Sequence, residues 1–425
     1  MKKTKSKKDY IITFITEFTL LIAGLLVYRY ANVYYGEEGF AKYALIRRTL
    51  SFIQPAILLG IGVGLPRYVS ISESLKKEKD SDSYLFSSTF IIFLVLLIFS
   101  PALLIFKNEF SWLFFGEEKY AFLISPFLVL LIGICFHAIA YSYLRGRLMM
   151  LLANLLQFVN LGIVLIGSFF LSNNIVEVIY FTGFGWLLFS LVLLLPFWIK
   201  ANIDYKLILL KSRELLKYGL QRVPGDFGLA ALLSLPVFIT THYSDLETGG
   251  YVAFGISLLS MTGAFFAPIS LILLPQTSAL FINKEYDLLK KKSKKILVMT
   301  ITLSIIGLFI FELLANEILT LYLKEISSEL VLVCMIIITG CVGYCIYVSL
   351  RSILDACYVK AINTINILIV VLFYCACEVI NYFIFGNTLV SHLIIISISF
   401  SLLGILTIIK VLKLFNKLQN EGDYD

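Results

Sequence analysis

The chain has 425 residues and a formal net charge of +7 at pH 7, and its composition excludes a water-soluble globule. Hydrophobic residues make up 59% of the chain and charged residues only 15%, whereas soluble domains carry about 25% charged residues. The mean hydropathy is +0.91. Because polar side chains are too few to cover a soluble fold of this length, the composition predicts an integral membrane protein.

Apolar runs of spanning length recur along the whole chain. A transmembrane helix needs about 20 mostly apolar residues, and twelve runs meet this requirement. We therefore predict an all-α polytopic membrane protein of about twelve transmembrane helices. The expected crossings are 10–30, 41–65, 84–106, 120–142, 148–172 and 176–199, followed by 219–241, 250–275, 295–315, 329–350, 361–384 and 388–409.

Basic residues gather on alternate loops, and this pattern predicts the orientation. Cytoplasmic loops of membrane proteins carry an excess of Lys and Arg. With the N-terminus inside, most of the 35 Lys and Arg residues fall on inner segments, above all the N-terminus, 66–83, 200–222 and 276–295. We therefore expect a multi-pass protein of the inner (cytoplasmic) membrane with both termini in the cytoplasm.

The two halves of the chain resemble each other. Three pairs of segments are similar. The first pair is NEFSWLFFGEE at 108–118 with NEILTLYLKEI at 316–326, and the second is GFAKYAL at 39–45 with GYVAFGI at 250–256. The third pair is 144–158 with 354–368. Each half has an even number of crossings, so the repeat is parallel, as in transporters built from two bundles. We expect two six-helix lobes, 1–210 and 211–425, around a central cavity, with a basic amphipathic junction at 200–218.

The second and eighth crossings carry two prolines each, which predicts bent helices. Pro55 and Pro66 lie in the second crossing, and Pro268 and Pro275 lie in the eighth. A proline removes one backbone hydrogen bond and bends the helix that contains it. Bent helices that line a cavity suit alternating access.

No motif predicts catalysis or a bound cofactor. Walker, HExxH and GxSxG patterns are absent, and the seven cysteines lack the spacing of a zinc site. We therefore predict that the chain is not an enzyme, with no catalytic residue, metal or cofactor. Glu37 and Glu38 in the first outer loop are similar to the acidic dyad of membrane glycosyltransferases. They also fit a solvated turn between Gly36 and Gly39, which we favour.

Two arginines lie inside the second crossing. Arg47 and Arg48 are about 10–12 Å from its outer end, at 1.5 Å per residue. Either they snorkel toward the outer interface, where Glu37 or Glu38 could pair with them, or at least one faces a polar cavity. Neighbouring residues on a helix point about 100° apart. We favour the cavity because a charge within the bilayer is costly.

In-span acids occur in both halves. Glu17 lies in the inner half of the first crossing, on a stripe with Thr13, and Asp226 follows Arg222 by one helical turn. At the repeat offset Glu17 falls within two residues of Asp226, so each lobe places one acid at a similar depth. Other in-span groups are the acids Glu312 and Glu378, and the histidines His137 and His392, which we expect to be packed or interfacial.

Three segments resemble a known family. They resemble O-antigen-type (Wzx-like) polysaccharide flippases. The three segments are KYGLQRVPGDFGLAALLSLPVFIT (217–240), LLPQTSALF (273–281) and YLRGRLMMLLANLLQFVNLGI (143–163). Those flippases belong to the multidrug/oligosaccharidyl-lipid/polysaccharide (MOP) superfamily. The resemblance implies a transporter that flips an undecaprenyl-pyrophosphate-linked oligosaccharide to the outer leaflet, for polysaccharide or lipopolysaccharide export. Its partners would be that lipid-linked oligosaccharide, membrane lipid and polysaccharide assembly enzymes, and no nucleic acid.

The residues fit this function in two ways. Arg47, Arg48 and Arg222 would bind the diphosphate, because guanidinium groups bind phosphate strongly and in a bidentate manner. Glu17 and Asp226 could couple transport to H⁺ or Na⁺. Alternatives are a cation-coupled multidrug or metabolite exporter of the same superfamily, and a membrane polysaccharide polymerase or ligase. A major-facilitator transporter is disfavoured because segment 66–83 lacks the Gly-Asp-Arg-Gly pattern.

Overall fold

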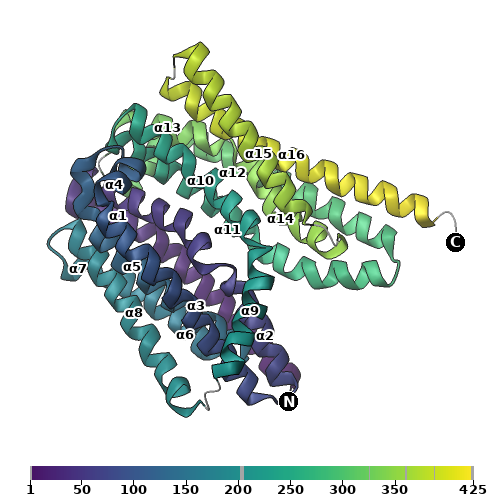
Figure 1. The fold of residues 1–425 in the computed structure, drawn as a ribbon. Helices are drawn as coiled ribbons and strands as arrows, with labels where there is room; N and C mark the ends of the chain where they lie inside the picture. The colour runs from purple at the N-terminus through teal and green to yellow at the C-terminus, as the bar shows by residue number, and fades with distance from the viewer. Residues whose placement is uncertain (1, 202–204, 325, 359–360, 387, 423–425) are drawn as a thin grey trace. The chain divides into compact units, whose positions relative to one another are not determined.

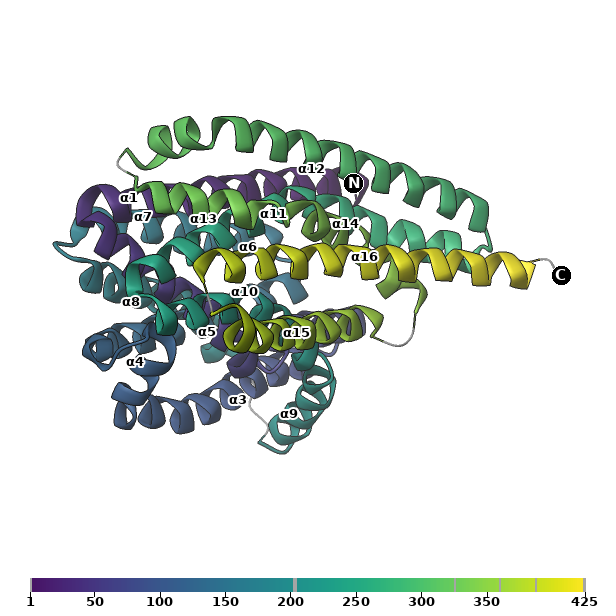
Figure 2. The ribbon, with the colours of Figure 1, turned by 90° about the horizontal axis from the view of Figure 1, so that it is seen from above.

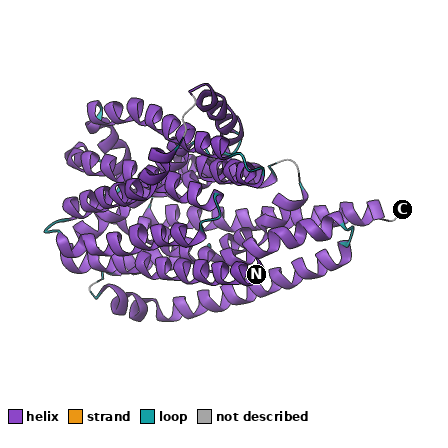
Figure 3. Ribbon diagram, turned by 90° about the horizontal axis from the view of Figure 1, so that it is seen from below, coloured by secondary structure: helices purple, strands orange, loops and turns teal. Residues whose placement is uncertain are grey.

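The computed structural model describes residues 2–201, 205–324, 326–358, 361–386 and 388–422, and every regular element in these ranges is helical (Figure 3). The predicted all-α fold is confirmed. Contacts divide the chain into two compact units, Met1–Phe227 and Gly228–Asp425. The division falls later than the 210/211 boundary that we expected, because the junction helix packs against the first unit.

The first unit is built of helices throughout (Figure 1). Its elements are α1 (Lys2–Leu58), α2 (Ile61–Ser74), α3 (Glu78–Ile105), α4 (Lys107–Phe115), the 3₁₀ turn η1 (Glu118–Leu123), α5 (Ile124–Gly146), α6 (Met150–Gln157), the π-helical η2 (Phe158–Val164), α7 (Leu165–Leu171), α8 (Ile175–Lys200) and α9 (Tyr205–Leu220).

Helix α1 folds back on itself at Gly36, where φ is +67°. The ring of Tyr28, before this point, lies 5.8 Å from the ring of Tyr43, after it. Along a straight helix the same two residues would be about 22 Å apart, so the two halves of α1 must lie side by side. Glycine tolerates this backbone conformation. The predicted outer loop 31–40 therefore contains the reversal between two crossings.

The second crossing bends by 45° between the end of α1 and the start of α2. Gly60, at the bend, adopts the left-handed conformation with φ +75°. Pro55 lies about one turn earlier in α1, where it weakens the backbone hydrogen bonding. A bend in this crossing was predicted from Pro55 and Pro66, and the structure places it between them.

The second unit has the same order of crossings. After α10 (Val223–Tyr243), which contains the division between the units, come α11 (Leu246–Ile282), α12 (Tyr286–Leu323), α13 (Ser328–Ile338), α14 (Cys341–Cys357), α15 (Ile362–Ile380), the π-helical η3 (Asn381–Phe385) and α16 (Leu389–Gly422). Helices α12 and α16 run roughly along one direction, with α14 packed against both (Figure 2).

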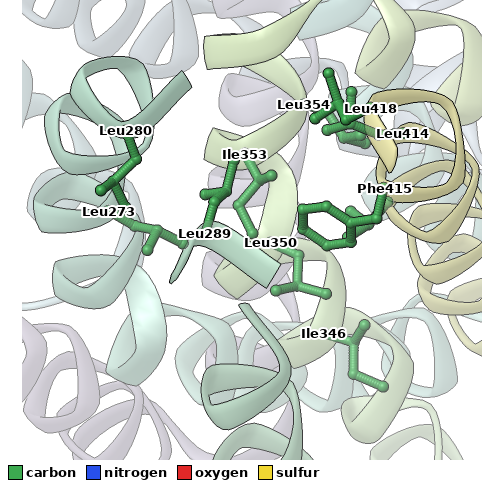
Figure 4. Close-up of a cluster of buried hydrophobic side chains, with 11 residues drawn as sticks. Leu273, Leu280, Leu289, Ile346, Leu350, Ile353, Leu354, Leu414, Phe415 and Leu418 are labelled. Carbon is green, nitrogen blue, oxygen red and sulfur yellow. The ribbon is translucent and has the colours of Figure 1, made fainter. Parts of the chain in front are cut away.

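A cluster of aliphatic side chains forms one core of the second unit (Figure 4). Leu273 and Leu280 come from α11 and Leu350 from α14, and Phe415 of α16 belongs to the same cluster. Leu350 is fully buried. Side chains of this kind lose no hydrogen bonds on burial and pack densely, so they hold α11, α14 and α16 together.

Glycine contacts repeat between the two units. In the first unit α5 packs on α8, and a β-carbon at Gly183 would lie 2.6 Å from the Leu130 nitrogen. In the second unit α14 packs on α16, and a β-carbon at Gly404 would lie 2.5 Å from the Gly343 α-carbon. Small residues allow membrane helices to approach closely. Both units thus pack their fourth crossing against their sixth through glycine, which supports the internal duplication.

The helices are long and apolar enough to cross a membrane. Among the described residues nine helices qualify, or up to eleven if two bent pairs count as one crossing each. The fold-back at Gly36 places two crossings in the first of those pairs, so the helices accommodate the twelve that we predicted. Large apolar side chains such as Ile98 (76% exposed) and Phe383 (77%) point outward, as expected for surfaces that contact lipid.

Candidate functional site

Arg47 and Arg48 lie on α1 after its fold-back. Arg48 is buried, with 7% of its surface exposed, and Arg47 is half-buried. The Arg47 guanidinium carbon lies 5.4 Å from the centre of the Tyr28 ring and 5.9 Å from that of Tyr43. Because aromatic faces attract cations, the two rings hold Arg47 inside the first unit. This packing favours the internal position over snorkelling.

Glu17 belongs to a polar group formed by α1, α5 and α6. Gln157 donates a side-chain hydrogen bond to the Glu17 carboxylate, and Arg145 interacts with it electrostatically. The Arg145 guanidinium carbon also lies 5.2 Å from the centre of the Tyr141 ring. On the same stripe of α1, Thr13 accepts a hydrogen bond of 3.0 Å from Asn154 Nδ2. The Glu17 side chain remains exposed.

A buried hydrogen-bond network adjoins this group. Asn160 Nδ2 lies 3.1 Å from His137 Nδ1 and 3.1 Å from the Ser190 hydroxyl, and Trp186 Nε1 donates to the Asn160 backbone carbonyl at 2.6 Å. The His137 ring stacks on Tyr141 at 6.0 Å, which links the network to Glu17. His137 is 5% exposed, in agreement with our expectation of a packed histidine.

Arg222 shares an aromatic ring with a second arginine. The Arg222 guanidinium carbon lies 4.6 Å from the centre of the Tyr218 ring, and that of Arg67 lies 4.7 Å from the same centre. The separation of the two guanidinium carbons therefore cannot exceed the sum of these two distances. Sequence reasoning had counted Arg67 only as a loop cation. Arg67 lies inside α2, and only the fold brings it to Tyr218.

Helix α9 is attached to α3 by polar contacts. Tyr84 donates a hydrogen bond to Glu214, and Lys211 lies 3.4 Å from Asp80 and 3.5 Å from Glu214. The Tyr68 ring stacks on Tyr84 at 5.1 Å and meets the edge of Tyr218 at 5.7 Å. This chain of rings and charges holds Tyr218, and with it Arg222, at the end of the first unit where α2, α3 and α9 meet.

Asp226 lies one helical turn after Arg222, as predicted. Its backbone N–H donates to the Arg222 carbonyl at 3.2 Å, and both side chains are exposed. The groups that act on Glu17 come from α5 and α6, and Asp226 is not among them.

Glu38 of the predicted acidic dyad forms a local ion pair. Its Oε1 lies 2.6 Å from Lys42 Nζ, one turn later, and Lys42 Nζ lies 5.4 Å from the centre of the Phe122 ring. The Glu38 side chain is 70% exposed and that of Lys42 only 15%. The exposure of Glu38 supports the interpretation of this loop as a solvated turn.

Comparisons with known proteins give matches to solved structures. No protein-family model and no curated protein matches the chain. A structure described as an inward-facing multidrug resistance MATE family transporter of the MOP superfamily is 13% identical, with a TM-score of 0.79, over 96% of this chain and 99% of that one. The lipid II flippase MurJ, in an inward closed conformation, is 17% identical, with a TM-score of 0.73, over 96% and 89%.

A third match is a MOP superfamily transporter from Pyrococcus furiosus, described by the reversed polarity of its binding pocket. It is 14% identical, with a TM-score of 0.69, over 97% of this chain and 96% of that one. The chain has the MOP transporter fold. The predicted superfamily resemblance is thus confirmed at the level of the fold, and the chain is a multi-pass membrane protein. The matched structures include a multidrug resistance transporter and a lipid II flippase, so the fold leaves the substrate open.

Proposed function

We propose that the chain flips an undecaprenyl-pyrophosphate-linked oligosaccharide from the cytoplasmic to the outer leaflet, for export of a cell-surface polysaccharide. The observation that carries this proposal is the supply of guanidinium groups in the first unit. Arg67 and Arg222 share the Tyr218 ring, and Arg47 with Arg48 lies farther along the second crossing. Guanidinium groups bind diphosphate oxygens in pairs.

The placement of these groups suits a moving anionic headgroup. A carboxylate that pairs with a guanidinium cancels its positive charge. An aromatic ring holds the guanidinium in place and leaves that charge uncancelled. Arg67 and Arg222 would receive the diphosphate near the predicted cytoplasmic end of the second crossing. Arg47 and Arg48 would receive it deeper, while the polyprenyl tail stays in the bilayer. Alternating access of the headgroup to the two sides would complete the transfer.

Coupling to an ion gradient would use the in-span acids. Glu17 is exposed and has fixed partners in Gln157 and Arg145, so binding of H⁺ or Na⁺ there would change a defined set of contacts. Asp226 would serve the same purpose beside Arg222. If neutralising both acids leaves transport just as sensitive to a collapsed gradient, this assignment is wrong.

The direct test measures flipping in proteoliposomes with a labelled undecaprenyl-pyrophosphate oligosaccharide. Replacing Arg47 and Arg48 together by Gln, or Arg67 and Arg222 together, should slow flipping at least about tenfold, because hydrogen bonds to charged groups contribute about 1.5–3 kcal/mol each. Arg213→Gln, at an exposed position of the neighbouring helix α9, is the matched control and should leave the rate unchanged. Wild-type vesicles that flip the probe no faster than empty ones would overturn the proposal.

A second candidate is a cation-coupled multidrug or metabolite exporter. The exposed carboxylate of Glu17 favours it, because an acid that cations can reach suits a positively charged drug or a coupling ion. The same vesicles, loaded with a cationic dye and an imposed gradient, distinguish the two: dye export that fails in Glu17→Gln but persists in the arginine variants would favour the exporter.

A polymerase or ligase would instead lose activity when Glu37 and Glu38 are replaced by alanine.

A further inference from the structure

Helix α12 begins with a dense group of lysines. Segment 284–295 carries six lysines and two carboxylates, and α12 starts within it at Tyr286. In the predicted orientation this end of α12 lies at the cytoplasmic surface of the membrane. Leu289 and Ser293 are buried on one face of the helix, where Leu289 joins the aliphatic cluster of Figure 4. Most of the lysines, together with Asp287, remain exposed.

The exposed face of α12 changes from basic to apolar along its length. At 100° per residue, Lys291 and Lys295 lie opposite the buried face, and Val298, Ile305 and Phe309 continue the same stripe. The three apolar side chains are between 49% and 64% exposed. About 21 Å of helix separates Lys295 from Phe309 at 1.5 Å per residue. This length matches a lipid headgroup followed by one leaflet of hydrocarbon, which is about 15 Å thick.

Helix α12 leaves this stripe free of contacts with the rest of the second unit. Only 11% of the most apolar stretch of α12 is buried, the lowest share among the nine qualifying helices of the described structure. The polar contact of α12 with α14, from the Thr300 hydroxyl to that of Ser349 at 3.0 Å, lies on the opposite, buried face. In the part of the chain that the structure describes, no ion pair involves Lys291, Lys294 or Lys295.

The corresponding helix of the first unit, α3, has the opposite charge at its start. At the repeat offset of 210, Lys290 and Lys292 correspond to Asp80 and Asp82. The junction helix α9 also packs on α3, where Lys211 lies 3.4 Å from Asp80. A general preference for basic cytoplasmic segments applies to both units, so it does not account for this difference. The exposed lysine group is a property of α12 alone within this pair of helices.

From these observations we propose that the exposed face of α12 binds an anionic phospholipid of the cytoplasmic leaflet. Its phosphate contacts Lys291, Lys294 and Lys295, and one acyl chain lies along the apolar stripe toward Phe309. Groups of four to eight basic residues just cytoplasmic of a transmembrane helix attract anionic lipids. An acidic protein would match the lysines alone, whereas a lipid matches both parts of the stripe. This binding goes beyond the proposed function, because it requires no assumption about the transported substrate.

Native mass spectrometry of the full-length protein in detergent, titrated with phosphatidylglycerol or with phosphatidylcholine of the same chain length, tests the charge dependence. Wild type should retain phosphatidylglycerol in preference. Replacing Lys291, Lys294 and Lys295 together by Gln should lower that affinity at least about tenfold, because each lysine near an anionic surface contributes about fivefold.

A matched variant in the first unit provides the control. Replacing Lys76, Lys77 and Lys79 together by Gln removes three exposed lysines beside the start of α3. This variant has the same change in net charge and should retain phosphatidylglycerol as wild type does. An equal loss in the two triple variants would show that total charge governs retention, and the site on α12 would be wrong.

The acyl chain is located by photo-cross-linking in nanodiscs. Phosphatidylglycerol with a diazirine at the end of one chain should label 305–309 in wild type, and the α12 triple variant should lose this labelling. Equal retention of phosphatidylcholine would overturn the proposal. So would displacement of the lipid by glycerol phosphate or poly-glutamate with no label at 305–309, which would indicate a soluble anion or an acidic protein. Flipping of the oligosaccharide probe is measured separately, so failure of either proposal leaves the other intact.

Discussion

Gly219 of α9 and Gly60, at the bend of the second crossing, are in backbone contact. A β-carbon built at Gly60 would lie 2.6 Å from the Gly219 α-carbon, and one built at Gly219 would collide with the Leu59 carbonyl. The junction helix is therefore attached to the bend itself, because only glycine allows two backbones to approach this closely.

Gly219→Ala should destabilise the protein even though alanine favours helix formation by about 1 kcal/mol over glycine. The added methyl group meets backbone atoms that cannot rotate away, so we expect a loss of about 1–3 kcal/mol. Thermal unfolding in detergent and protease cleavage within 200–222 would measure it. Gly62→Ala in α2, which has nothing within 4 Å, is the control and should be neutral or stabilising. Equal stability of the two variants would contradict the contact.

The duplicated glycine contacts should be equally sensitive in both units. Gly133→Ala places a β-carbon against the backbone of Gly183, and Gly343→Ala does so against the backbone of Phe400. Each should lower the unfolding temperature, because the helices must move apart. Gly167→Ala and Gly307→Ala, one in each unit and open in space, serve as controls. A loss in only one unit would argue against equivalent packing in the repeats.

The Asn160 network should contribute to the stability of the first unit. Asn160→Leu leaves the buried Ser190 hydroxyl and His137 ring without their shared donor, which costs about 1–3 kcal/mol. Ser190→Ala should cost less, since Asn160 keeps its contact to His137. Detergent-based unfolding curves give both values. An Asn160→Leu variant at least as stable as Ser190→Ala would show that the network is dispensable.

An ion pair connects α2 to the end of α5. Arg147 Nε lies 3.0 Å from Glu73 Oε1, with side-chain exposures of 22% and 28%, and Arg147 also donates to the Tyr143 hydroxyl at 3.3 Å. A double-mutant cycle of Glu73→Gln and Arg147→Gln should yield a coupling energy of about 0.5–1 kcal/mol, which falls with added salt. The same cycle on the more exposed Glu117–Lys119 pair should give about zero. Identical values for the two pairs would refute this ranking.

Tyr218 should matter for transport through its ring and not through its hydroxyl. Tyr218→Phe removes only the hydroxyl that is hydrogen-bonded to Arg67 and preserves the ring surface on which Arg67 and Arg222 rest. Because that ring holds both arginines, flipping of the labelled lipid-linked oligosaccharide should stay near the wild-type rate. Tyr218→Leu removes that surface and should slow flipping as much as the paired arginine variant does. Tyr205→Leu, on the same helix and 82% exposed, is the control. Slow flipping by Tyr218→Phe would shift the role to the hydroxyl group.

Local sequence patterns were sufficient for most of the fold. Apolar runs of spanning length predicted the crossings, since the bilayer core sets helix length regardless of tertiary contacts. The repeat offset of 210 that relates 144–158 to 354–368 also relates Gly133 to Gly343, whose close packing the structure then showed. The orientation and the role of each arginine stay predictions, because they depend on the membrane and on a bound substrate.

By itself the sequence determined that the chain is a helical membrane protein with two related halves, because length, apolarity and repetition are properties of local segments. Only the tertiary structure decided which charges meet. Arg67 and Arg222 contact the same Tyr218 ring. Glu378 contacts His392, which also contacts the Pro236 carbonyl. These partners come from separate helices whose packing is set by shape and small-residue contacts, and no spacing along the chain encodes that packing.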